Sequence, residues 1–196
     1  HVAQQLLNTS SAGLKNIVIL SDGEATFSHP FVAAATYANC EAWTDWTCPR
    51  GGKITNIGAF APDYSSVIGK GNSFTMDYNA KVTATCPEHG KSTTVNCVYN
   101  LDGTYTTTSG TNNGVATIWE ANQAKAAGTT IYSVALQAGT NGENTLKTCA
   151  TDATKDYYAI ASADNVEEKL TTAFTSIAGS IAIAASNGVV NDPMGE

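Results

Sequence analysis

Four residues that could carry chemistry, Ser21-Asp22-Gly23-Glu24, follow directly on the apolar run Ile17 to Leu20. Four consecutive aliphatic residues are typical of a strand that is buried on both faces, as at the centre of a parallel sheet. Because open α/β sheets bind ligands at the carboxyl ends of their strands, Asp22 occupies the position where a metal ion or a substrate would be met. The alternative interpretation is that Asp22 only caps a turn after the strand.

The segments around this strand have the patterns of alternating helices and strands. The expected elements are helices over 1–7, 115–127 and 144–151, strands over 130–136 and 157–160, and a last helix from Asn165. Asn165 stands three residues before Glu168, as in a capping box. The last helix carries one apolar stripe that we expect to lie on the sheet, formed by Val166, Leu170, Phe174, Ile177 and Ile181. We therefore predict an α/β fold, a Rossmann-like doubly wound and mostly parallel sheet.

Residues 28–111 differ in character from the rest of the chain. Gly, Thr, Asn, Tyr and Pro separate short alternating runs, among them 73–78, 81–85 and 94–99, which favour antiparallel strands and hairpins, with a turn over 101–104. We interpret 28–111 as an inserted β and loop module, and 1–27 with 112–186 as the α/β domain that carries it. A segment this small builds little core of its own, so we expect disulfides to stabilise it.

Five cysteines occur in the chain, and four of them fall in this insertion as two close pairs. We predict the disulfides Cys40–Cys48 and Cys86–Cys97, although four cysteines allow three connectivities. A zinc site is the competing interpretation, but its ligands are usually two to four residues apart, and neither pair has that spacing. Cys149 is left over, either as a buried thiol or with a partner outside this chain.

The composition limits the function classes. Charged residues make up 14% of the 196 residues and the formal net charge is −7, so nucleic acid is not an expected partner. No apolar run approaches the roughly 20 residues that a membrane-spanning helix needs. Disulfides in an acidic chain rich in Thr and Asn indicate a secreted or cell-surface protein.

Several of these features together resemble the second half of a von Willebrand factor A domain. They are the strand that ends in Ser21-Asp22-Gly23-Glu24, the helix that ends in Lys125-Ala126-Ala127-Gly128, the strand over 130–136, the strand entry Asp156-Tyr157-Tyr158 and the closing helix. The chain is most similar to the type found in surface adhesins and pilus tip proteins of Gram-positive bacteria. The resemblance covers 1–27 and 112–196, and the insertion matches no module that we can name.

The resemblance implies a metal-ion-dependent adhesion site, built from three loops at the carboxyl edge of the sheet. Of these loops only the one with Asp22 is present, where Asp22 would hold Mg²⁺ or Mn²⁺ while Ser21 and Glu24 shape the loop. No D-x-S-x-S sequence occurs, and Asp63-Tyr64-Ser65-Ser66 has the wrong spacing. The chain thus corresponds to a domain without its N-terminal strands, and a single carboxylate binds such a cation weakly or not at all.

The resemblance further implies an adhesion module at the cell surface or cell wall, which binds an extracellular protein of a host matrix or of another cell. Segment 187–196 would lead toward a neighbouring Ig-like domain of the same polypeptide. Trp43 and Trp46 would form an aromatic contact surface, since Trp is enriched at binding hot spots, unless they form the small core of the insertion.

Two other functions compete with adhesion. One is a structural pilin module without a ligand of its own. The other is a metal-dependent α/β hydrolase, in which His29 would be the base beside Asp22. The chain contains no phosphate-binding G-x-x-x-x-G-K-[ST] loop, no G-x-G-x-x-G and no G-x-S-x-G elbow, so we do not expect an enzyme.

Overall fold

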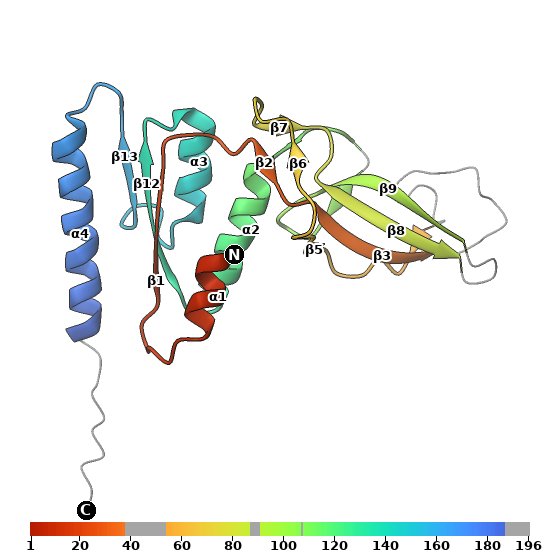
Figure 1. Cartoon of the computed structure of the whole chain (residues 1–196), viewed down its shortest axis with the longest axis horizontal. Coiled ribbons are helices and arrows are strands. Elements are labelled where there is room, and N and C mark those ends of the chain that lie inside the picture. The colour runs from red at the N-terminus through yellow and green to blue at the C-terminus, as the bar shows by residue number, and fades with distance from the viewer. Residues whose placement is uncertain (38–53, 87–90, 107, 187–196) are drawn as a thin grey trace, which may run out of the picture. The chain divides into compact units, whose positions relative to one another are not determined.

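The chain folds into two compact units in the computed structural model (Figure 1). The α/β unit consists of residues 1–23 and 120–196, and the β-rich unit consists of residues 24–119. The structure describes residues 1–37, 54–86, 91–106 and 108–186.

The boundaries of the two units differ by a few residues from those expected for the insertion. The β-rich unit begins at Glu24 and extends to Trp119, whereas the sequence suggested 28–111. Helix α2 (Gly114–Ala126) is therefore divided between the two units. The physical reason is that Val115, Ala116 and Trp119 on the first turns of α2 pack on the core of the β-rich unit.

A three-stranded parallel sheet forms the centre of the α/β unit, in the order β1–β12–β13. Its strands are β1 (Asn16–Ser21), β12 (Thr130–Leu136) and β13 (Tyr157–Ile160). The last two strands were predicted with these bounds. The middle strand, β12, is buried over five consecutive residues, because it has a neighbour on each side and helices on both faces.

Helices cover both faces of this sheet, with α4 on one face and α3 on the other (Figure 1). The helices of the α/β unit are α1 (Val2–Asn8), part of α2, α3 (Gly139–Cys149) and α4 (Val166–Ser186). The backbone N–H of Glu168 donates a hydrogen bond to the Asn165 side-chain oxygen at 3.4 Å, so the predicted cap at the start of α4 forms. Within the described residues, no helix is long and apolar enough to span a membrane.

The apolar stripe of α4 packs on the sheet largely as predicted. Four of its five members contact the cluster around Tyr132, Val134 and Ile160, and these are Val166, Leu170, Ile177 and Ile181. The exception is Phe174, whose side chain is 42% exposed. Ala173 takes the buried position on that turn, because it lies directly above Ile177 in the helix.

The strand β1 differs from its predicted environment. We expected a central strand buried on both faces, but in the described part of the chain β1 pairs with β12 alone and stands at the edge of the sheet. Ile19 packs against the α3 side, while Val18 and Leu20 are exposed by 42% and 49%.

The β-rich unit is built on a six-stranded mixed sheet with the path β10–β9–β8–β3–β4, in which β5 also pairs with β3. The strands are β3 (Phe31–Tyr37), β4 (Ile54–Thr55), β5 (Ala61–Pro62), β8 (Ala80–Cys86), β9 (Lys91–Tyr99) and β10 (Tyr105–Thr106). Two small ladders join β2 (Phe27–Ser28) to β6 (Ile68–Gly69), and β7 (Thr75–Met76) to β11 (Thr111–Asn112). The hairpin β8–β9 is antiparallel as predicted, whereas β3 and β8 pair in parallel.

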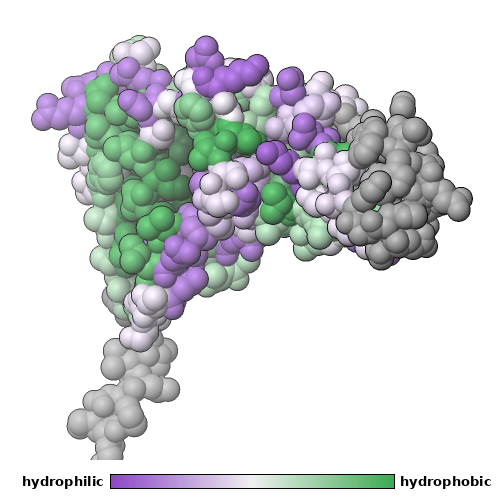
Figure 2. Space-filling view, turned by 45° about the vertical axis from the view of Figure 1, so that its right-hand side comes forward, coloured by the Kyte–Doolittle hydropathy of each residue, from purple (hydrophilic) through white to green (hydrophobic). Residues whose placement is uncertain are grey.

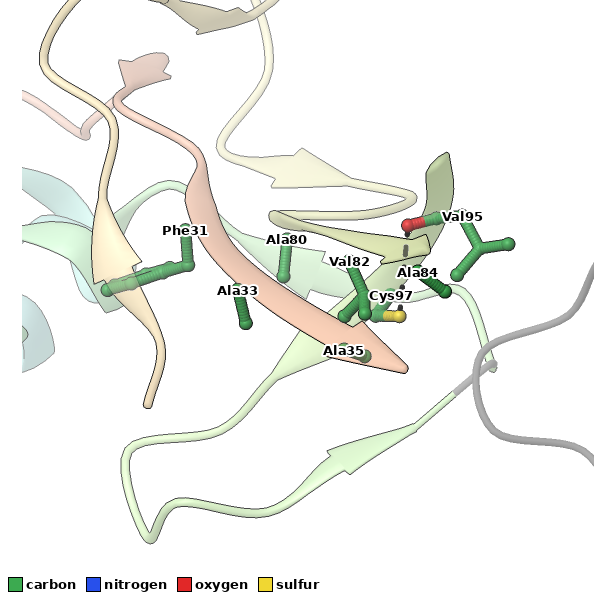
Figure 3. Packing of buried hydrophobic residues seen from close by; sticks show 8 residues of the cluster. All are labelled: Phe31, Ala33, Ala35, Ala80, Val82, Ala84, Val95 and Cys97. Carbon is green, nitrogen blue, oxygen red and sulfur yellow. Dashed lines mark hydrogen bonds between the residues drawn. The ribbon is translucent and has the colours of Figure 1, made fainter. Parts of the chain in front are cut away.

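One face of this sheet carries the core of the β-rich unit, and Figure 3 shows the small strand residues of this core together with Phe31. Aromatic side chains pack against the cluster, namely Phe60, Tyr99, Tyr105 and Trp119. The fully buried Phe31 ring contacts Tyr99 with ring centroids 4.7 Å apart and Trp119 at 6.0 Å. Residues of β8 alternate strictly between buried and exposed, which places alanine and valine inside and lysine and threonine outside.

The predicted Cys86–Cys97 disulfide is wrong, because the two residues lie at opposite ends of the β8–β9 hairpin. Cys86 is opposite Lys91, whereas Cys97 is opposite Ala80. Six residues of strand separate these positions by about 20 Å, and a disulfide needs Cα atoms within about 7 Å. Cys40 and Cys48 lie outside the described residues. Cys149 is a buried free thiol, one of the two alternatives that the sequence left open.

Candidate functional site

Asp22 lies at the carboxyl end of β1, directly after the last strand residue, and its side chain is exposed. The strand holds this position through its parallel register with β12, in which Ser21 is opposite Ala135. Asp22 makes no hydrogen bond or ion pair with any residue in the described ranges. The carboxylate is therefore free to contact a ligand, and it does not serve as the turn cap that was the alternative interpretation.

Ser21, rather than Asp22, stabilises the turn. Its hydroxyl accepts a hydrogen bond from the Gly23 N–H and donates one to the Gly23 carbonyl, both at 3.4 Å. Helix α3 packs on the same turn, because a side chain at Gly142 would place its Cβ 2.8 Å from the Gly23 carbonyl oxygen. This close approach of two backbones fixes the loop from Ser21 to Gly23 against helix α3.

The other predicted site residues lie elsewhere. Glu24 is exposed and is the first residue of the β-rich unit, so the structure does not assign it to the loop of the α/β unit. Trp43 and Trp46 lie outside the described residues. His29 belongs to the β-rich unit, where its Nδ1 is 2.6 Å from the Ser66 carbonyl oxygen and its ring packs against Tyr64.

Two residues at the same edge of the sheet were not singled out from the sequence. Gln137 follows β12, is exposed and has a left-handed backbone with φ of 55°, while its N–H donates to the Ile160 carbonyl at 2.8 Å. Asp164 follows β13 and accepts a hydrogen bond from the Ala161 N–H at 2.7 Å. The signal that could have found both is their position just after a predicted strand.

The residues present do not by themselves fit a divalent cation. Mg²⁺ takes about six oxygen ligands in near-octahedral geometry, and in proteins it usually keeps several waters and is held by one or two carboxylates together with further oxygen ligands. In the part of the chain that the structure describes, no group of three or more His, Cys, Asp or Glu side chains could hold a metal ion. At the carboxyl end of β1, Asp22 is a single carboxylate.

The sequence Asp63-Tyr64-Ser65-Ser66 has a structural role and does not form an adhesion loop. Asp63 accepts hydrogen bonds from the Ser65 N–H at 3.0 Å and from the Ser66 hydroxyl at 2.7 Å. Hydrogen bonds from the Ser65 and Ser66 hydroxyls also lower the pKa of the Asp63 carboxyl. Its oxygens are thus occupied by its own turn.

The parallel sheet with helices on both faces defines the class of the α/β unit as a doubly wound α/β fold. No protein-family model matches the sequence, and no curated protein matches it either.

Solved structures identify the fold more closely. One is the vWF domain of the type V pili tip protein Mfa5 from Porphyromonas gingivalis, with 20% identity and a TM-score of 0.50, covering 97% of this chain and 68% of that chain. Another is the pilus adhesin SpaC from Lactobacillus rhamnosus GG in its open conformation, with 19% identity and a TM-score of 0.50, covering 91% of this chain and 18% of that chain. The chain thus spans about a fifth of the length of SpaC.

The chain has the fold of a von Willebrand factor A-like domain, as the resemblance in its sequence implied. At 97% coverage the similarity to the Mfa5 domain extends over the β-rich unit as well. This corrects the expectation that the insertion matches no module that we can name. The insertion contains no short sequence motif that could have revealed the similarity.

Proposed function

We propose that this chain is a ligand-binding module of a bacterial pilus tip or surface adhesin. The observation that carries the proposal is the exposed, unpartnered carboxylate of Asp22 on a fixed loop at the carboxyl end of β1. Its position matches the place where α/β sheets bind ligands. The similarity to the Mfa5 domain and to SpaC supports a role in pili, since both are described as pilus proteins.

The binding that we propose depends on Mg²⁺ or Mn²⁺ held in part by Asp22. Since the described residues supply one carboxylate, the remaining oxygens come from the complete domain, and the chain alone binds such a cation weakly or not at all. A carboxylate of an extracellular protein would complete the coordination of the cation and so provide specific recognition.

The β-rich unit, in this proposal, is stabilised by disulfides, as suits a protein at the cell surface. Neither Cys86 nor Cys97 is a free thiol, which supports this view. Because the register of β8 and β9 prevents them from bonding to each other, peptide mapping without reduction should recover each linked to another cysteine.

Calorimetric titration with Mg²⁺ and with Mn²⁺ tests the proposed function. We expect saturable binding by the full-length polypeptide, little or none by the 196-residue chain, and at least a tenfold loss of affinity in the full-length Asp22→Ala variant. The matched control is Asp63→Ala, which removes an exposed carboxylate that is already occupied by its own turn. No heat of binding in the full-length polypeptide would contradict a metal-dependent site and favour a structural pilin module.

A further inference from the structure

The hydrogen bonds of β8 determine which way the backbone of β9 faces. On one side β8 pairs in parallel with β3, and at the start of this ladder the Phe31 N–H donates to the Asn79 carbonyl at 2.8 Å. In a strand, the N–H and C=O of one residue point to the same side and those of the next residue point to the other side, so Lys81 also faces β3. Ala80 and Val82 therefore point their backbone groups toward β9, the antiparallel neighbour.

The outer edge of β9 is formed by the residues between those that bond to β8. Thr93 and Val95 are opposite β8 residues that face β9, and they exchange hydrogen bonds with them. The backbone groups of Ser92, Thr94 and Asn96 consequently point away from β8, and all three residues are exposed. Strand β10 pairs with β9 only beyond this stretch, so within the described ranges no strand pairs with these three residues.

The sequence of this edge contains nothing that blocks a further strand. Natural edge strands are commonly protected by charged side chains, proline or a bulge. Segment 92–96 has neither charge nor proline, and the ladder to β8 runs without interruption from Lys91 to Cys97, so no bulge bends the edge. The Thr94 hydroxyl already lies 3.0 Å from the Thr83 hydroxyl across the ladder, which shows that hydroxyl pairs fit between strands here.

The surface around the edge is polar. Figure 2 shows hydrophobic side chains gathered on the surface of the α/β unit, whereas the β-rich unit, where it is coloured, is mostly white, pale or purple. The exposed side chains of the β8–β9 hairpin are Lys81, Thr83, Thr85, Ser92, Thr94 and Asn96. A partner at this edge is therefore held by hydrogen bonds and not by an apolar patch.

The free stretch of β9 is complementary to a second copy of itself. An antiparallel pair of β9 strands with a two-fold axis at Thr94 places this residue opposite Thr94 of the second copy, and Ser92 opposite Asn96. The backbone groups of all three residues point outward, so each opposite pair can exchange both of its hydrogen bonds. Hydroxyl and amide side chains then face one another, and no two like charges meet.

A strand from an unrelated protein is less well matched to this edge. Proteins that bind an added strand take affinity from main-chain hydrogen bonds and specificity from pockets for alternate side chains. The exposed side chains along the edge are short, so they offer an unrelated peptide little to recognise. For a second copy the two-fold axis sets the register, and β10 limits slippage because it occupies the edge from Val98 onward.

We propose that β9 is a self-association surface, through which two copies of the chain pair antiparallel over 92–96 and join their β-rich sheets into one. Because the same patch serves both copies, the pairing closes as a dimer and does not propagate into a fibre. The edge is short, so the dimer is weak and reversible. The proposal concerns the β-rich unit alone and depends neither on Asp22 nor on a metal ion.

Opposite charges at Thr94 test both the partner and the register. Sedimentation equilibrium of the full-length polypeptide, up to about 1 mM, should show a reversible dimer. Thr94→Lys and Thr94→Glu each place like charges across the axis, so we expect each variant alone to dimerise at least about tenfold more weakly, and an equimolar mixture to recover the dimer. The control Thr83→Lys adds the same charge to the same face one strand away from the axis, and it should dimerise like the wild type.

Three results would overturn the proposal. The wild type could remain a monomer at every concentration. The dimer could persist in both charge variants, which would place its interface elsewhere. The mixture could dimerise no better than either variant alone, which would exclude this register.

Hydrogen exchange gives a second test with a control built into the strand. The amides of Thr93 and Val95 bond to β8 in monomer and dimer alike, whereas those of Ser92, Thr94 and Asn96 are protected only when a second strand pairs with the edge. On dilution we expect the three outward amides to exchange at least about tenfold faster, with the two control amides unchanged. Outward amides that are protected at every dilution would show that another part of the polypeptide covers the edge, and would overturn the proposal.

Discussion

At the scale of single residues, the carboxylates of the chain differ in what occupies their oxygens. Asp63, Asp102 and Asp152 each accept hydrogen bonds from a hydroxyl and an N–H two residues further on, which lowers the pKa of each carboxyl. Such turns stabilise loops locally. Asp22 has no such partner in the described ranges, which is why we propose it as the ligand-binding carboxylate.

Cys149 gives a prediction about alkaline pH. Burial raises the pKa of its thiol to about 11, despite a smaller opposing effect of the Lys125 ammonium group. A pKa that is higher in the folded state stabilises the fold fully below the ordinary pKa of 9.0, and this contribution is lost as the pH rises through 11. We expect the stability advantage of the wild type over Cys149→Ala to shrink by about 2–3 kcal/mol between pH 8 and pH 11.

Urea denaturation of both proteins at each pH measures this difference. Tyrosines that titrate in the same range contribute equally to the two proteins and cancel. An advantage that stays constant with pH would mean that the Cys149 thiolate is not penalised by its surroundings.

At the scale of elements, α4 is stabilised by a narrow stripe of buried side chains. Ile177 is 3% exposed and Phe174 is 42% exposed, although both belong to the stripe expected from the sequence. We expect Ile177→Ala to cost about 2–5 kcal/mol of unfolding free energy. Phe174→Ala should cost clearly less, although it removes the larger side chain. Equal losses of unfolding free energy in the two variants, measured by urea denaturation, would mean that Phe174 is buried by residues outside the α/β unit.

The sequence predicts elements well where the pattern is strong and local. The run 130–136 became β12 because a central strand of a parallel sheet needs apolar residues at every position. The sequence placed the start of helix α3 near Asn144, because Gly139 and Gly142 have low helix propensity. The helix begins at Gly139 instead, and the packing of Gly142 against the Gly23 carbonyl fixes its first turns.

Register and long-range pairing could not be predicted in the same way. The parallel pairing of β3 with β8 joins segments that are far apart in the chain. The proximity of Cys86 and Cys97 in the sequence hid the fact that Cys97 lies at the open end of the ladder, opposite Ala80 and six positions from the pair of Cys86 with Lys91. Spacing along the chain does not determine distance across a hairpin until the register is known.

At the scale of the whole molecule, the chain combines an α/β unit that carries Asp22 with a β-rich unit that has its own core. The position of Asp22 directly after a strand was predictable from nine residues, because the end of the aliphatic run marks the end of the strand. The aliphatic run itself did not predict the edge position of β1, since it predicts burial without stating which residues provide it. The exposed edge was expected only from the resemblance, which left this strand without a neighbour on one side.

The measurement that tests the central claim most directly is Mn²⁺-induced broadening of amide NMR signals in the full-length polypeptide. A bound paramagnetic ion broadens the signals of nearby nuclei even when it is present below the protein concentration. We predict that the signals of Ser21, Asp22 and Gly23 broaden first, while Asp152, near the opposite end of β12, is unaffected. Broadening centred on Asp152, or none anywhere, would contradict a metal-dependent ligand site at Asp22.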